Sequence, residues 1–189
     1  FDGNVYVGSF GEHRIMKFSP EGKILALFGA DRVKMPNDLA FDRDSNRYVA
    51  DSRSNVIWVY SNEGALVRTI RQGDLKYPNA VEIAYLPIGS ENAVGELYVS
   101  DHDHFLVKVF DIEGNLLRSF GGLPIKHCGM MGSWWEWQGK FVSIQSLAMD
   151  SGGRLHVLDD YMNKAQILSP SGTYIDYYGN EATPNMFKL

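Results

Sequence analysis

The chain has 189 residues, enough for one domain with a sizeable core. Its formal net charge of −5 disfavours nucleic acid as a partner, because phosphate binding needs a basic face. No apolar run approaches the about 18 residues of a membrane-spanning helix, so we expect no membrane span. The single cysteine excludes an intrachain disulfide, and the sequence leaves extracellular, periplasmic and cytoplasmic locations equally open.

A four-fold repeat runs along the chain. Each unit opens on an aromatic or histidine residue followed by valine, at Tyr6, Tyr48, Tyr98 and His156. A glycine follows 16 residues later in every unit, after a short polar turn, at Gly22, Gly64, Gly114 and Gly172. A constant spacing in four copies indicates a repeat protein, in which each unit is one supersecondary structure.

Short apolar runs within each unit are rich in β-branched and aromatic residues and are bounded by Gly, Pro, Asn, Asp and Ser, which is typical of strands. In chain order we expect three strands in the first unit, over 6–9, 14–18 and 23–29. Each later unit is expected to have four strands, and the first strands of these units lie over 37–42, 79–84 and 145–150. Four short antiparallel strands recurring every 42 to 58 residues predict a β-propeller blade. The fold is therefore predicted to be all-β, with about four blades of a six-bladed propeller.

Residues 1–189 are expected to form one incomplete propeller domain. The first unit lacks its first strand, and residues 184–189 resemble the first strand of a further blade or a strand that closes the ring on the first unit. An open arc would expose apolar blade faces, so we expect assembly with missing blades or with a partner chain. The extra residues at 86–96 are expected to form a loop between two strands of the third unit.

The repeat residues carry a family resemblance. Pro36, Asp42, Tyr48 to Asp51, Asn55 and Gly64 match the NHL pattern, as do Asp101, Phe110, Gly114 and Phe120. The sequence resembles the NHL-repeat propellers and, more distantly, the peptidyl-hydroxyglycine amidating lyase and gluconolactonase-like propellers. The resemblance implies a propeller fold and says little about function, because propellers host many activities.

Four carboxamide side chains occupy equivalent positions at the start of the predicted first strands: Asn37, Asn79, Gln145 and Asn185. In the related lyases a histidine at this place binds zinc, for which a carboxamide is a poor replacement. In the gluconolactonase-like propellers an asparagine at a similar place is a ligand of a divalent cation. The amides are therefore predicted either to hold a hard cation such as Ca²⁺ or to hydrogen-bond nearby backbone.

The loops after the second strands and a Trp-rich insertion share one face of the predicted propeller. We interpret this face as a ligand-binding surface, because aromatic residues are enriched in binding hot spots; its candidate residues are Trp134, Trp135, Trp137, Asp51, Arg53, His102, His104 and Asp160. The competing interpretation is that the insertion plugs its own channel. The adjacent His and Asp residues at 101–104 could also bind a transition metal, although the repeat position that Asp101 shares with Asp51 and Asp159 favours loop hydrogen bonding.

The sequence shows no nucleophile elbow and no phosphate-binding loop. We therefore predict a non-enzymatic binding or scaffold propeller that recognises a protein, peptide or small ligand. A cation-dependent lyase or hydrolase at the channel mouth is the alternative, and a structural module of a larger assembly is a further one.

Overall fold

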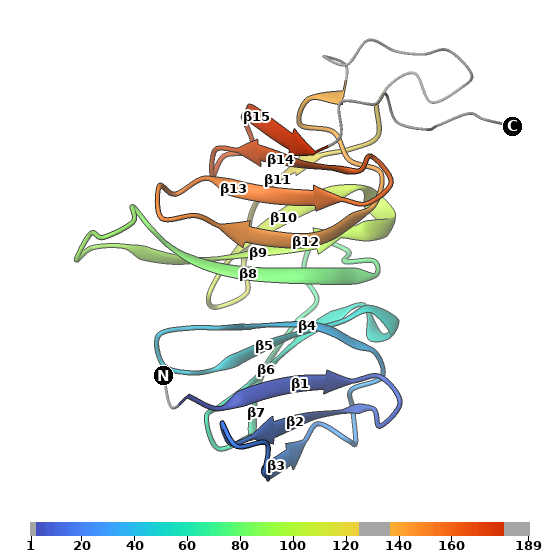
Figure 1. Cartoon of the computed structure of the whole chain (residues 1–189), viewed down its shortest axis with the longest axis vertical. Coiled ribbons are helices and arrows are strands. Elements are labelled where there is room, and N and C mark those ends of the chain that lie inside the picture. Colours follow the sequence, from blue (N-terminus) through green and yellow to red (C-terminus); the bar gives the residue numbers. More distant parts are fainter. Residues whose placement is uncertain (1–2, 125–136, 180–189) are drawn as a thin grey trace, which may run out of the picture.

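The computed structural model describes residues 3–124 and 137–179 and is all-β apart from short 3₁₀ turns. Within these ranges, 15 strands form four antiparallel sheets, which follow one another in chain order along the long axis of the molecule (Figure 1). We call these sheets blades 1 to 4. The predicted all-β propeller fold is confirmed.

Consecutive strands pair as neighbours in every blade. Blade 1 contains β1 Val5–Ser9, β2 Arg14–Phe18 and β3 Ile24–Phe28. Blade 2 contains β4 Pro36–Phe41, β5 Arg47–Asp51, β6 Val56–Tyr60 and β7 Leu66–Ile70. Blade 3 contains β8 Pro78–Leu86, β9 Val94–Asp101, β10 Leu106–Asp111 and β11 Leu116–Gly121. Blade 4 contains β12 Ile144–Met149, β13 Leu155–Asp159, β14 Lys164–Leu168 and β15 Tyr174–Gly179.

The repeated glycines close the hairpins between the last two strands of each blade. Gly22, Gly64, Gly114 and Gly172 have φ values of +84°, +87°, +95° and +90°. Glycine adopts this backbone conformation without the steric cost that a Cβ brings. The constant spacing in the sequence thus reflects one turn geometry used four times.

Neighbouring blades contact mainly through their first strands, with β4 against β8 and β8 against β12. Apolar side chains fill the space between the sheets: Tyr48, Ile57 and Phe110 lie between blades 2 and 3, and Tyr98, Val107 and Val157 between blades 3 and 4. Burial of such side chains contributes about 1.5–3 kcal/mol each. These clusters therefore make a large contribution to the packing of one blade on the next.

Blade 1 has three strands, and its β1 lies beside β4 of blade 2. Among the described residues, no strand is hydrogen-bonded to the other edge of β1, and the expectation that the first unit lacks its first strand stays a prediction. A groove of about 500 Å³ runs along this edge, with Tyr6, Leu39 and Arg47 among its lining residues. The predicted strand at 184–189 lies outside the described residues.

One expected loop is shorter than the sequence suggests. The extra residues of the third unit were expected to form a loop over 86–96, but β8 and β9 extend into it and Leu86 pairs with Val94. Only residues 87–93 remain outside the strands. Val94 lies in the extended part of β9, where it pairs with Leu86 of β8, and its apolar side chain is exposed. In the described ranges, no helix has the length and apolar composition needed to cross a membrane.

Candidate functional site

One end of the blades carries the turns after β5 and β9 and the segments that lead into β4, β8 and β12; we call it the top face. Two 3₁₀ turns, η1 Ser52–Ser54 and η2 His102–His104, lie here directly after β5 and β9. Each turn ends on a residue with positive φ, Asn55 or Phe105. The chain thus reverses within a few residues and places its polar side chains at the ends of the strands.

Asp51 anchors the top face of blade 2. Its buried carboxylate accepts hydrogen bonds from the backbone N–H groups of Lys34 and Met35 at 2.9 Å each, and from that of Ser54 at 3.2 Å. The indole Nε1 of Trp58 donates a fourth bond at 2.9 Å. Burial alone would raise the pKa of Asp51, but these donors outweigh it and lower the pKa below its ordinary value.

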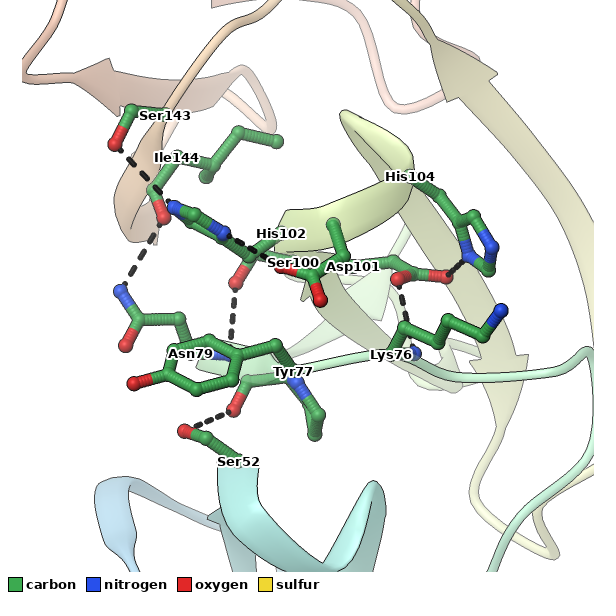
Figure 2. Close-up of polar contacts among 12 residues, drawn as sticks. Ser52, Lys76, Tyr77, Asn79, Ser100, Asp101, His102, His104, Ser143 and Ile144 are labelled. Carbon is green, nitrogen blue, oxygen red and sulfur yellow. Dashed lines mark hydrogen bonds and ion pairs between the residues drawn. The ribbon is translucent and has the colours of Figure 1, made fainter.

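Asp101 anchors the top face of blade 3 in the same way, but with different partners. It accepts from the backbone N–H of Lys76 at 3.0 Å and from His104 Nδ1 at 2.8 Å (Figure 2). It also pairs with the buried ammonium group of Lys108. Lys108 occupies the position on β10 that Trp58 occupies on β6, opposite the valine two residues before the aspartate. The same ammonium group donates to the carbonyl oxygen of Asp74 at 3.1 Å.

The hydrogen-bond donors to Asp159 of blade 4 are backbone N–H groups. It accepts from the backbone N–H groups of Val142 at 2.7 Å and Met162 at 3.1 Å. Gln166 stands at the position of Trp58 and donates to the carbonyl oxygen of Lys140 at 2.7 Å. Burial then dominates and raises the pKa of Asp159.

The amides at the start of the first strands form a row across the top face. Asn37 Nδ2 donates to Asn79 Oδ1, and Asn79 Nδ2 donates to Gln145 Oε1 at 2.9 Å and to the carbonyl oxygen of Ile144 at 3.3 Å. Gln145 Nε2 donates to Ser143 Oγ at 3.1 Å. The row therefore links blades 2, 3 and 4 by side chains alone. Asn185, the fourth predicted member, lies outside the described residues.

A hollow of about 420 Å³ opens beside this row. Its walls combine amides, an aromatic ring, an imidazole, a carboxylate and a thioether, from Met35, Asn37, Tyr77, Asn79, His102, Asp103 and Gln145. Converging polar groups beside an aromatic ring make this hollow a candidate ligand site. We call this hollow the top-face pocket.

His102 and Tyr77 form one wall of the pocket. Their ring centroids are 5.6 Å apart, and Figure 2 shows the two rings near each other beside Asn79. His102 Nε2 lies 3.4 Å from Ser143 Oγ, and its Nδ1 lies 3.2 Å from Asp103 Oδ1. The imidazole is therefore held between blade 4 and its own 3₁₀ turn.

The structure separates the predicted ligand-binding residues into groups. His102 lines the pocket, Arg53 and Asp160 are exposed, and His104 is half-buried against Asp101. Asp51 is fully buried, and its carboxylate is hydrogen-bonded to the segment before β4, so it lies beneath the surface. Trp137 is also buried. Trp134 and Trp135 lie outside the described residues.

Sequence reasoning missed Tyr77 and Met35 as pocket residues. Each directly precedes the proline that begins a first strand, so they occupy equivalent repeat positions. The repeat register that aligned Asn37 with Asn79 could have found them, because adjacent repeat positions converge on the same face.

Among residues 3–124 and 137–179, no three His, Cys, Asp or Glu side chains gather closely enough to hold a metal ion. The amide row could offer only neutral oxygens, of which those of Asn79 and Gln145 already accept hydrogen bonds. Hard cations prefer several oxygen ligands including carboxylates. The row as described is thus well suited to hydrogen bonding.

Comparisons with known proteins support the fold. No protein-family model matches the sequence. Over 125 residues the chain is 27% identical to "Protein brain tumor" of Drosophila melanogaster, a match that covers 62% of this chain and 11% of that protein.

Solved propellers superpose on nearly the whole chain. The Pan2 WD40 domain of Neurospora crassa gives a TM-score of 0.64 at 12% identity, over 95% of this chain and 47% of that one. Virginiamycin B lyase from Staphylococcus aureus gives 0.66 at 16% identity, over 97% of this chain and 54% of that one. The chain is a β-propeller, and it spans about half the length of these solved propellers.

Proposed function

We propose that the chain is a non-enzymatic propeller of the NHL type that binds a protein or peptide segment in the top-face pocket. The pocket beside the amide row is the observation that carries this proposal. The NHL type rests on the repeat motif around Tyr48, Asp51 and Gly64.

The chemistry of the pocket suits an extended peptide. A carboxamide nitrogen donates two hydrogen bonds and its oxygen accepts two, so Asn37 and Gln145, which the bonds within the row engage only in part, can also bond the N–H and C=O groups of a peptide backbone. Tyr77 and Met35 add apolar surface for a side chain. The buried Asp51 and Asp101 hold the surrounding loops in place, which reduces the entropy lost on binding.

Peptide binding can be tested with an array of 12-residue peptides, followed by calorimetric titration of the peptides that bind. Tyr77→Ala and Asn79→Ala are each expected to weaken binding about tenfold or more, since they remove contacts at the centre of the site. Glu91→Ala is the control, because Glu91 is exposed in the loop between β8 and β9, away from the pocket. Unchanged affinity in both pocket variants, or no binding peptide at all, would overturn the proposal.

The Trp-rich insertion carries a separate prediction. If Trp134 and Trp135 contact the partner, Trp134→Ala and Trp135→Ala remove affinity without lowering the melting temperature. Trp137→Ala should behave differently and lower the melting temperature, because Trp137 is buried. Normal binding by the first two variants would show that the insertion only fills its own channel.

A Ca²⁺ ion at the amide row stays a prediction, and a cation-dependent lyase or hydrolase depends on it. A bound ion would stabilise the fold by about 2.7 kcal/mol at a concentration 100 times its dissociation constant. Thermal melting with CaCl₂ and with excess chelator measures this directly. Equal melting temperatures would count against both the ion and the cation-dependent enzyme.

A further inference from the structure

Tyr77 is held in a strained backbone conformation at the wall of the top-face pocket. Its φ of +53° lies in the left-handed region, which a bulky L-residue rarely adopts. Met35, the equivalent residue in blade 2, does not have a positive φ. Strained residues persist only where the surrounding structure holds them, and they cluster at binding sites. The conformation of Tyr77 is therefore a property of this pocket, because the repeat itself does not require it.

Contacts with blade 2 hold Tyr77 in this conformation. Its backbone N–H donates to Asn55 Oδ1 at 2.9 Å, and its hydroxyl donates to Met35 Sδ at 3.6 Å. Asn55 ends the 3₁₀ turn after β5, so a turn of blade 2 fixes the residue that leads into β8 of blade 3. The side chain of Tyr77 is half-buried and lines the pocket. The loops thus present an aromatic ring to the pocket at a defined place.

Hydrogen-bond acceptors with unused capacity line the pocket beside this ring. Asp103 Oδ1 lies 3.2 Å from His102 Nδ1, whereas none of the described residues bonds Asp103 Oδ2. Asn37 donates its Nδ2 to Asn79, and its Oδ1 accepts from no residue in the described ranges. Gln145 Oε1 accepts one bond from Asn79, and an amide oxygen can accept two. A carboxylate and two amides therefore offer acceptors to a ligand.

The pocket also carries a negative charge that no cationic neighbour in its lining neutralises. Asp103 is exposed, and the described residues that line the pocket include no lysine or arginine. Lys76 precedes Tyr77 in the chain, but its Nζ lies 3.8 Å from Asp74 Oδ2, and Figure 2 shows its side chain directed away from the Tyr77 ring. The whole chain has a net charge of −5. Electrostatics at this site therefore favours a positively charged ligand group.

We propose that the top-face pocket selects its peptide by a positively charged side chain, arginine or lysine, an inference that rests on the proposed function. The ring of Tyr77 stacks on the cation, as aromatic faces do on guanidinium and ammonium groups. Asp103 and the free amide oxygen of Asn37 accept hydrogen bonds from its N–H groups. Met35 packs against the aliphatic stem of the same side chain.

The 12-residue peptides selected by the array test this inference. In each of them, every arginine is replaced in turn by citrulline and every lysine by acetyl-lysine, which removes the charge and retains most of the side chain. One replacement in each peptide should raise the dissociation constant about tenfold, because it removes both the cation–π contact and the ion pair. Peptides that bind without any arginine or lysine, or equally well when neutral, would overturn the inference and leave the proposed function standing. The absence of any binding peptide would overturn both.

Asp103→Asn tests the carboxylate, because it removes the charge and keeps the size of the side chain. Calorimetric titration should show about fivefold weaker binding of the charged peptide and an unchanged dissociation constant for its neutral analogue. An equal loss for both peptides, or no loss for either, would contradict the inference. Glu91→Gln is the charge-matched control, since Glu91 is exposed in the loop between β8 and β9, and it should leave both constants unchanged.

Tyr77→Phe and Tyr77→Leu test the ring. Phenylalanine keeps the aromatic face and should keep the full preference for the charged peptide over its neutral analogue. Leucine is apolar but has no aromatic face, so the preference should fall about threefold. Both replacements are L-residues at the same φ, so the backbone strain is matched between them. A full preference in Tyr77→Leu would overturn the stacking of the cation on the ring, and an unchanged circular dichroism spectrum confirms that each variant is folded.

Discussion

Replacing Asp51 with alanine is expected to lower the free energy of unfolding by about 3–5 kcal/mol. The carboxylate is buried and accepts four hydrogen bonds that fix the segment before β4 and the turn after β5. Alanine leaves the indole N–H of Trp58 and the backbone N–H groups of Lys34 and Met35 without an acceptor in a site that excludes water. Urea unfolding of the two proteins measures the difference.

Asp160→Ala is the control for this experiment, since Asp160 is an exposed aspartate on the same face. Its effect should stay within about 0.5 kcal/mol. A loss below about 1 kcal/mol for Asp51→Ala would show that the loops hold themselves without the carboxylate.

The pH dependence of stability gives a second check on Asp51. Its pKa is lowered in the folded protein, so its contribution is present above the unfolded pKa of about 3.9 and is lost as the pH falls through the folded value. The stability difference between the parent and Asp51→Asn should therefore shrink as the pH is lowered from 7 towards 3. A difference that is constant over this range would contradict the assignment.

The fold could be predicted from the sequence because one turn is used four times. A hairpin with positive φ selects glycine, so Gly22, Gly64, Gly114 and Gly172 mark the turns and the strands between them follow. The extension of β8 and β9 could not be predicted in this way. Residues 86–96 contain Gly, Pro, Ser and Asn, and local turn composition does not reveal that Leu86 and Val94 still pair.

The site was predicted less well than the fold, for a physical reason. The repeat register located Asn37, Asn79 and Gln145, because equivalent positions in successive blades converge. Register cannot tell a buried residue from an exposed one at the end of a strand. Asp51 was assigned to the surface, whereas its carboxylate is held by donors from a segment 16 and 17 residues earlier in the chain.

Whether a polar residue at the end of a strand is exposed or is a buried anchor therefore has to be decided from its hydrogen-bond partners. Asp51, Asp101 and Asp159 share one repeat position, and the third-strand residues opposite the valine two residues before them are Trp58, Lys108 and Gln166. Trp58 and Lys108 contact their aspartate, whereas Gln166 bonds the carbonyl oxygen of Lys140. The aspartate is kept in all three blades while this third-strand residue varies. This argues that the position holds the loops, and it is consistent with the proposal that His102 and Tyr77 contact the ligand.

Gly172→Ala is expected to lower the free energy of unfolding by about 3 kcal/mol. Two effects add: the residue has a φ of +90°, which costs an L-residue about 1–2 kcal/mol, and the new Cβ would overlap the ring of Phe120 from blade 3. The ring cannot move freely, because it belongs to the apolar cluster between blades 3 and 4. Thermal unfolding measures the loss.

Gly22→Ala separates the two effects, because Gly22 has a φ of +84° and its added Cβ would meet nothing within 4 Å. It should therefore cost only the backbone strain, about 1–2 kcal/mol. Equal losses at the two glycines would mean that the contact between Phe120 and Gly172 adds nothing to the packing of blade 3 on blade 4.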